Sequence, residues 1–375
     1  MKNILVTGAA GFLGKNLCTH LSLCEDVIVL SYDIDTPPEL LDEYVRSVDV
    51  IFHLAGVNRP EKVEEFESGN AGFTQILIDL LQKHGRKPHV IVSSSTQASL
   101  DNPYGQSKRH GEEILERWDE TTGAKVSIFR LTNLFGKWCR PNYNSVTATF
   151  CHNIANDLPI QISDPGYTVK LAYVDDVVAA FLHEMNEQPQ RNGYIVEPDP
   201  IPVTTISLGD LAARIQFYHD MPKTLMIPDM ANQFNKQLYV TYLSYVPAKN
   251  WEYGPPIHTD DRGNLAELLK SESFGQMFVS RTKPGITRGN HYHHTKTEKF
   301  IVISGEAVIQ FRHIFGDEII DFPVKGEDYR IVNIPPGYTH SITNVGNTEL
   351  ITLFWASKIF DKTDLDTYFL AVKES

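Results

Sequence analysis

The first half of the chain alternates short apolar runs with longer amphipathic segments. Segments such as Phe66–Lys83 and Tyr104–Glu120 have helical character and separate the apolar runs. Strands that alternate with helices favour right-handed βαβ units around a parallel sheet, so we expect a doubly wound α/β domain here. The predicted strands are Ile4–Thr7, Val27–Leu30, Val50–Leu54, Val90–Ser93 and Val126–Leu131.

From about Asp260 the pattern changes to short β-branched runs that follow one another closely, with Gly and Pro between them. Little room remains for helices, which predicts an all-β jelly roll or barrel. The segment 221–256 joins the halves and includes a possible helix at Met230–Leu243. We therefore predict two domains, residues 1–245 and 246–375. The strands expected in the second are Gln276–Arg281, Lys299–Ile303, Ala307–His313, Tyr329–Ile334 and Leu350–Trp355.

Length and charge narrow the class of protein. A chain of 375 residues exceeds what one hydrophobic core usually supports. The formal net charge of -13 argues against a partner such as nucleic acid, which needs a basic surface. The four cysteines are scattered, and we find neither a signal peptide nor an apolar run long enough for membrane insertion. These features predict a cytoplasmic protein.

A glycine-rich turn follows the first predicted strand. Gly8, Gly11 and Gly14, with Phe12 and Leu13 between them, open a helix. Such glycines allow a tight turn and close approach of a pyrophosphate, which the helix N-terminus then binds. The turn alone would be weak support, but its place at a strand-to-helix junction predicts a dinucleotide site.

Two acidic residues, Asp33 and Asp35, end the second strand about twenty residues later. A carboxylate there can bind ribose hydroxyls and would repel a ribose phosphate, which favours NADH over NADPH. For either residue alone, an ordinary acidic loop explains the position equally well.

The pair Tyr104 and Lys108 predicts proton transfer. Residues four apart share one helix face, and the nearby ammonium would lower the pKa of the phenol and make it a proton donor. The run Ser93–Thr96 ends the preceding strand. We expect Ser95 to hydrogen-bond the substrate oxygen, with Ser94 as the alternative, although serine runs also serve as caps or turns.

Together with Phe52–Gly56 and Arg130–Gly136, these motifs resemble the extended short-chain dehydrogenase/reductases, enzymes with a Rossmann-like domain. The resemblance implies that His53, Leu54 and Ala55 line the coenzyme groove and that Asn133 lies near the substrate. It further implies a nucleotide sugar as substrate.

The second half carries a set of metal-ligand residues. His291, His293 and Glu298 are spaced between two glycines, Gly285 and Gly305, and His340 follows Pro335-Pro336-Gly337. Alternation on a strand would direct His291 and His293 to one side, and imidazoles with a carboxylate suit zinc or another divalent transition metal. These spacings resemble the two signatures of the cupin family. Some sugar-epimerase cupins instead use histidines as bases without metal. No residue is identifiable as the base here: Lys299, Tyr292 and His294 are adjacent candidates, but a surface or packing role explains each of them better.

Over nearly its full length, including Gly136–Ser145 and Gly289–Lys296, the chain resembles the bifunctional capsular polysaccharide synthesis enzymes of the UDP-N-acetyl-L-fucosamine pathway. The resemblance implies a homodimer that uses NADPH, which Asp33 and Asp35 fit poorly, so NADH stays open. It implies that the cupin domain epimerises carbon 3 of a UDP-linked 4-keto-6-deoxy-amino sugar. The first domain would then reduce carbon 4.

Three alternatives remain. The cupin could be a structural or dimerising module attached to a simple reductase. The chain could be a redox sensor without catalysis, although the complete Ser95, Tyr104 and Lys108 set argues against that. The cupin could also be a sugar-binding or storage module.

Overall fold

The computed structural model describes residues 1–187, 193–196, 201–361, 363 and 366–373. The chain forms two compact units, Met1–Gln216 with Gln237–Pro247 and Phe217–Lys236 with Ala248–Ser375. The predicted domain boundary between residues 245 and 246 stays a prediction. Within the described residues, no helix combines the length and apolar character that crossing a membrane requires.

The first unit is built on a parallel sheet with the strand order β2-β1-β3-β4-β5. All five strands overlap the predicted ones, because each apolar run is covered on both faces of the sheet. The register pairs Thr7 with His53, which brings the ends of β1 and β3 together. The strands are β1 (Lys2–Thr7), β2 (Val27–Tyr32), β3 (Val50–His53), β4 (His89–Ser95) and β5 (Val126–Leu131).

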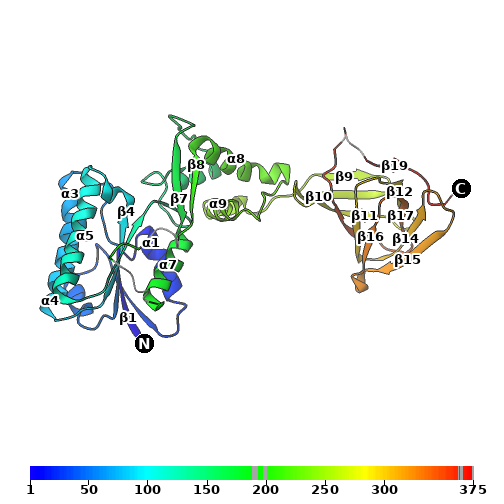
Figure 1. Cartoon of the computed structure of the whole chain (residues 1–375). Helices are drawn as coiled ribbons and strands as arrows, with labels where there is room; N and C mark the ends of the chain where they lie inside the picture. The colour runs from blue at the N-terminus through cyan, green and yellow to red at the C-terminus, as the bar shows by residue number, and fades with distance from the viewer. Residues whose placement is uncertain (188–192, 197–200, 362, 364–365, 374–375) are drawn as a thin grey trace. The chain divides into compact units, whose positions relative to one another are not determined.

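Helices cover both faces of this sheet (Figure 1). On one face, α1 (Phe12–Leu21) and α7 (Val174–Glu187) contribute to one apolar core. On the other, α2 (Pro38–Tyr44), α4 (Phe73–Lys83) and α5 (Pro103–Thr122) contribute to a second core. This arrangement confirms the predicted Rossmann-like fold.

The remaining elements of the chain up to residue 250 include one departure from prediction. The helix expected at Phe66–Lys83 is interrupted by a π-helical turn at Ser68–Gly72, between α3 (Glu64–Glu67) and α4. A small sheet combines β6 (Asn133–Phe135), β7 (Thr168–Tyr173) and β8 (Val203–Ser207). The other elements are 3₁₀ turns at Thr96–Ser99 and Ala248–Asn250 and helices α6 (Val146–Ala155), α8 (Leu208–Thr224) and α9 (Gln233–Leu243).

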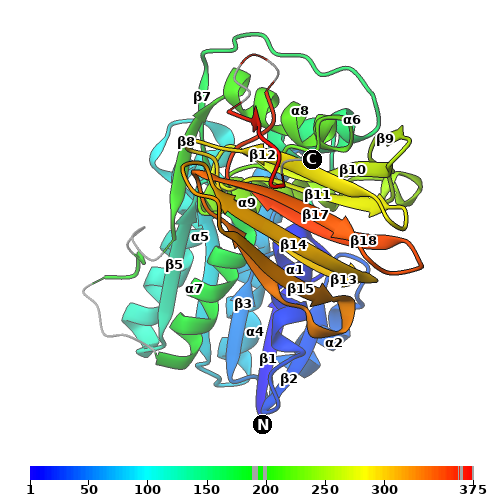
Figure 2. The same ribbon diagram turned by 90° about the vertical axis from the view of Figure 1, so that its right-hand side faces the viewer.

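The second unit contains two antiparallel sheets, with the orders β16-β13-β18-β11-β10-β9 and β15-β14-β17-β12-β19. Figure 2 looks onto these strands, and the described residues between them contain no α-helix. Their inward side chains, such as Phe300, Ile309 and Phe354, form a separate core. This all-β barrel confirms the predicted cupin fold.

The first of these sheets contains β9 (Ile257–Asp260), β10 (Gly263–Ser271), β11 (Gly275–Thr282), β13 (Glu298–Ser304), β16 (Ile331–Ile334) and β18 (Leu350–Ala356). The second contains β12 (Thr287–Tyr292), β14 (Glu306–His313), β15 (Ile319–Lys325), β17 (Tyr338–Asn344) and β19 (Tyr368–Phe369), and a 3₁₀ turn spans Gly326–Asp328.

Candidate functional site

The glycine-rich turn is tightly packed at the end of β1. Gly8 has a positive φ of 69°, and a Cβ there would lie 2.8 Å from the Ala55 nitrogen. A Cβ on Gly14 would lie 2.1 Å from the Gly8 oxygen. Within the part of the chain that the structure describes, no side chain caps α1 at Gly11, so the amide groups of its first turn, which holds Phe12 and Leu13, are available to an anion.

Asp33 lies beside this turn. Its Oδ2 accepts a hydrogen bond of 2.7 Å from the Ala10 amide, and its Oδ1 accepts one of 2.8 Å from Ile34. Asp33 and Ala10 also line a cavity of about 760 Å³. The carboxylate is therefore next to the predicted pyrophosphate site, whereas Asp35 is exposed.

The ring of His53 is buried at the end of β3. Its Nδ1 lies 2.9 Å from the Thr7 hydroxyl and its Nε2 lies 2.9 Å from the Thr74 hydroxyl. Burial, assisted by the charge of Lys108, lowers the pKa of His53 to about 3. The neutral ring, with both nitrogens bonded to protein hydroxyls, fixes the end of β3 beside the predicted coenzyme groove. Leu54 and Ala55 continue from it, and the Ala55 amide also bonds Thr7.

Helix α5 brings Tyr104 and Lys108 together near the end of β4. Asn102 caps the helix by accepting a 2.9 Å hydrogen bond from the Gly105 amide, which places Tyr104 in its first turn. The Lys108 ammonium lies 6.0 Å from the centre of the Tyr104 ring and 3.3 Å from the Ser93 oxygen. The predicted residues therefore meet at the carboxyl end of the parallel sheet.

The pKa of Tyr104 in this pair differs from the prediction. Burial lowers the pKa of Lys108 to about 8, partly opposed by the negative charge of Glu112. Burial raises the pKa of Tyr104, and a hydrogen bond with Ser95 only partly offsets it. The predicted lowering of the phenol pKa is thus wrong for this state of the protein, because desolvation outweighs the other contributions.

Sequence reasoning missed Asn70, which lies in the π-helical turn. Its side-chain amide bonds both main-chain groups of Val57 and the hydroxyl of Ser107, each at 3.0 Å. A Cβ on Gly56 would lie 2.6 Å from Asn70 Oδ1 and 2.9 Å from the Lys108 ammonium. Asn70 thus joins the loop after β3 to helix α5. The only sequence signal was the pair of glycines that interrupts the helical pattern.

Sequence reasoning also missed the buried carboxylate of Glu112. Arg130 binds it through two nitrogens, with Nη2 2.6 Å from Oε2 and Nε 3.0 Å from Oε1. Ser94 donates a hydrogen bond to the same carboxylate.

Asn133, the predicted substrate contact, is exposed at the start of β6.

In the second unit, His291, His293, Glu298 and His340 converge. One possible ligand atom from each lies within 4.8 Å of those of the others. Glu298 Oε2 is 3.4 Å from His293 Nε2 and 3.5 Å from His340 Nε2. Both Nε2 atoms are buried without a hydrogen-bond partner among the described residues. Buried polar atoms are normally paired, so these nitrogens fit a metal ion.

The cluster combines two sheets. His291 lies in β12 and pairs with His340 of β17, whereas Glu298 begins β13 of the other sheet. His293 follows β12, so it reaches the cluster from the connecting loop and not, as predicted, from within the strand. Burial lowers the pKa of His291 to about 4, which keeps this imidazole in the neutral form that binds metals.

Two lysines next to the four ligand candidates lie in different surroundings. Lys299 is exposed and its ammonium donates a hydrogen bond of 2.5 Å to Asn333. The Lys296 ammonium, which the sequence did not single out, lies 3.4 Å from Glu298 Oε1. Burial opposes ionisation of Glu298, but its contacts with His293, His340 and Lys296 lower its pKa overall. One carboxylate beside three imidazoles suits zinc, iron or manganese.

Comparison with known proteins defines the class. Residues 4–196 match the NAD dependent epimerase/dehydratase family, and residues 258–368 match the polysaccharide biosynthesis C-terminal domain. The first match implies a nicotinamide coenzyme. A UDP-glucose 4-epimerase of Thermotoga maritima, 20% identical with a TM-score of 0.54 over 65% of this chain and 98% of its own, shares the fold.

The full length points to a narrower group. The chain is 44% identical over 371 residues to a UDP-2-acetamido-2,6-beta-L-arabino-hexul-4-ose reductase of Pseudomonas aeruginosa, covering 99% of both. It is 43% identical, with a TM-score of 0.90, to the capsular polysaccharide assembling protein CapF of Staphylococcus aureus, covering 99% of this chain and 100% of that one. The chain belongs to this family of two-domain reductases, as its sequence motifs predicted.

Proposed function

We propose that this chain is a bifunctional nucleotide-sugar enzyme of capsular or O-antigen precursor synthesis. Its substrate is a UDP-linked 4-keto-6-deoxy-N-acetylhexosamine. The cupin domain inverts carbon 3, and the domain of residues 1–245 then reduces the carbon 4 ketone with NADPH or NADH. The observation that carries the proposal is that one chain holds both Tyr104 with Lys108 and the His291, His293, Glu298 and His340 cluster. The similarity to the P. aeruginosa reductase over 99% of both chains supports it.

The proposed reduction uses three side chains. Tyr104 donates its proton to the carbon 4 oxygen while the nicotinamide supplies a hydride to carbon 4. Ser95 hydrogen-bonds the same oxygen, where negative charge develops. The ammonium of Lys108 stabilises the phenolate that Tyr104 becomes and binds the coenzyme ribose. Gly8, Gly11 and Gly14 leave space for the pyrophosphate, and Asn133 contacts the sugar nucleotide.

The proposed epimerisation requires the ketone at carbon 4, which makes the neighbouring carbon 3 proton acidic. His291, His293, Glu298 and His340 would hold zinc or a related divalent ion. When bound, the ion would polarise the ketone and stabilise negative charge on its oxygen. Epimerisation must come first, because reduction removes the ketone on which it depends. The family resemblance also supports a homodimer, which light scattering of the purified protein would test.

One experiment separates the two activities. The protein is incubated with the keto sugar in deuterated water without nicotinamide and followed by proton NMR, then again after chelation and after adding NADPH or NADH. We expect deuterium at carbon 3, loss of that exchange on chelation, and reduction when coenzyme is added. NADPH or NADH oxidation without any exchange would instead support a reductase with a structural cupin.

A further inference from the structure

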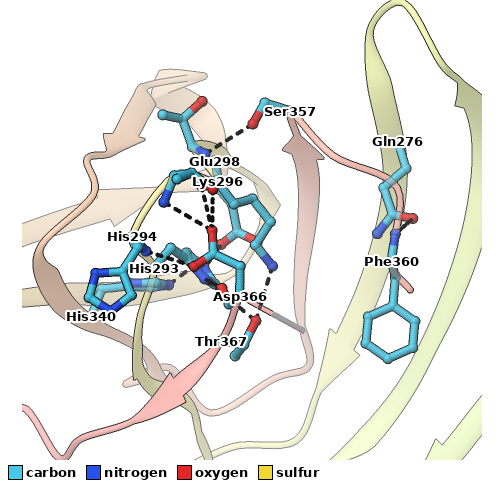
Figure 3. A network of polar contacts seen from close by, with 12 residues as sticks. Gln276, His293, His294, Lys296, Glu298, His340, Ser357, Phe360, Asp366 and Thr367 are labelled. Atoms are coloured by element: carbon cyan, nitrogen blue, oxygen red, sulfur yellow. Dashed lines mark hydrogen bonds and ion pairs between the residues drawn. The ribbon is translucent and has the colours of Figure 1, made fainter. Parts of the chain in front are cut away.

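The carboxylate of Asp366, near the end of the chain, binds the loop between β12 and β13 (Figure 3). Its Oδ1 accepts a 2.8 Å hydrogen bond from the His294 amide. Its Oδ2 accepts three more, from the amides of Thr295 at 2.9 Å and Lys296 at 2.8 Å and from the Thr295 hydroxyl at 2.7 Å. This loop lies between His293 and Glu298, so one side chain fixes the connection between two ligand candidates.

The main chain of Asp366 makes a second contact. Its carbonyl oxygen lies 2.6 Å from Nδ1 of the buried His293. Because a carbonyl can only accept, Nδ1 carries the proton, so in the neutral imidazole Nε2 is the nitrogen with the free lone pair. Nε2 is the atom that faces Glu298 at 3.4 Å. Hydrogen bonds to the ring nitrogen that does not bind the metal fix the tautomer and orientation of metal-binding histidines.

The residues after Asp366 are held by β12, which carries His291, and by Arg312 of β14. Strand β19 pairs with β12, and the Leu370 amide donates a 2.9 Å hydrogen bond to the Asn290 oxygen. Arg312 donates to the Ala371 oxygen at 2.7 Å. Asp366 is therefore anchored from its C-terminal side, so its carboxylate and carbonyl are presented to the loop from a fixed position.

We propose that Asp366 is a positioning residue of the cupin site, which fixes the Nδ1-protonated form of His293 and the path of the loop to Glu298. This inference rests on the proposed metal-binding function. Asp366 touches no reacting atom, and it acts through His293. Without the carboxylate, the four hydrogen bonds from the loop are lost, so the loop no longer holds His293 against the Asp366 carbonyl.

The first test is metal affinity in the full-length protein. Apoprotein is titrated with cobalt(II), and its visible spectrum is recorded for wild type, Asp366→Ala, Asp366→Asn and the control Asp361→Ala. Asp361 is exposed and its carboxylate bonds Thr363. We expect Asp366→Ala to weaken cobalt binding about 10-fold or more and to alter the spectrum. Asp366→Asn, which keeps one acceptor oxygen, should bind cobalt with an affinity between those of Asp366→Ala and wild type. Asp361→Ala should bind cobalt as wild type does. Wild-type affinity and spectrum in Asp366→Ala would overturn the proposal.

The second test needs no metal. The imidazole ¹⁵N signals of the apoprotein report which nitrogen of His293 carries the proton, with the assignment made from His293→Asn. We expect a single Nδ1-protonated form in wild type and a mixture in Asp366→Ala. Reduction of an already epimerised keto sugar by NADPH or NADH should stay unchanged, which shows that the reductase domain is intact. If wild type binds no cobalt, the metal-dependent part of the proposed function fails. The tautomer comparison then still decides the role of Asp366, and an unchanged His293 signal in Asp366→Ala refutes it.

Discussion

Ser94 donates a hydrogen bond to the buried carboxylate of Glu112, which also binds the guanidinium of Arg130. The hydroxyl of Ser94 is thereby engaged in the interior of the first unit. Ser95, the next residue on β4, projects to the opposite side of the strand and interacts with the hydroxyl of Tyr104. Ser95, whose oxygen also accepts a hydrogen bond of 3.2 Å from the Gln97 amide, therefore stays our prediction for the donor to the substrate oxygen.

We therefore expect Ser95→Ala to lower kcat for ketone reduction by roughly 100-fold, the effect typical of removing one donor to a developing oxyanion. Ser94→Ala is the matched control and should retain most of the activity, since Arg130 still pairs with Glu112. The rate of NADPH or NADH oxidation with the keto sugar measures both. A large loss in Ser94→Ala together with an active Ser95→Ala would reverse the assignment.

The depressed pKa of Lys108 predicts a pH dependence. Burial lowers this pKa to about 8, so the ammonium loses its proton as the pH rises above that value. The Tyr104 pKa is raised, so its own ionisation comes at still higher pH. We expect kcat/KM for the coenzyme in the reductase assay to be constant near neutrality and to decline above about pH 8.

The control for this profile is Lys108→Arg, because a guanidinium keeps its charge throughout the range. Its overall rate should be lower, but the decline above about pH 8 should disappear or move to more alkaline pH. The same decline in Lys108→Arg would show that a different group is responsible.

Sequence predicted those parts of the molecule that depend on local spacing. The strand β1 with its glycine turn and the four-residue interval between Tyr104 and Lys108 are properties of one element, and the structure contains both elements. Contacts between distant segments had no such signal. Glu112 pairs with Arg130 across two elements, and Asp366 reaches His294 over 72 residues. Local patterns carry no information about which distant polar groups will satisfy one another.

The contact of Asp33 with the glycine turn leads to a prediction about the coenzyme. A carboxylate beside the Ala10 amide would repel the phosphate on the ribose of NADPH. We expect Asp33→Ser to raise the ratio of kcat/KM for NADPH over NADH by about 10-fold, equivalent to roughly 1.4 kcal/mol. Asp35→Ser is the control, because Asp35 is exposed, and it should leave the ratio unchanged. Equal ratios for wild type and Asp33→Ser would place the ribose away from Asp33.

Substitution of Glu298 should separate the two proposed activities. Glu298→Gln removes the negative charge that lies 3.4 Å from His293 Nε2 and 3.5 Å from His340 Nε2. We expect metal affinity to fall at least about 10-fold and deuterium exchange at carbon 3 to be lost, while reduction of an already epimerised keto sugar continues. Metal content by atomic emission and proton NMR provide the two measurements. The control Glu306→Gln changes an exposed carboxylate in the same domain, and loss of exchange in that variant too would indicate a general effect on folding.

The close packing of Gly14 predicts a cost for a single methyl group. A Cβ at this position would lie 2.1 Å from the Gly8 oxygen and 2.8 Å from the Ala9 Cα, and neither main-chain atom can move without displacing the turn. We expect Gly14→Ala to destabilise the first unit by about 1–3 kcal/mol and to weaken coenzyme binding. Gly111→Ala is the matched control, since its Cβ would meet nothing closer than 3.5 Å and alanine is the better helix former. Thermal unfolding with and without coenzyme compares the two. If Gly14→Ala melted like Gly111→Ala and bound coenzyme normally, the turn would have to be more adaptable than its packing indicates.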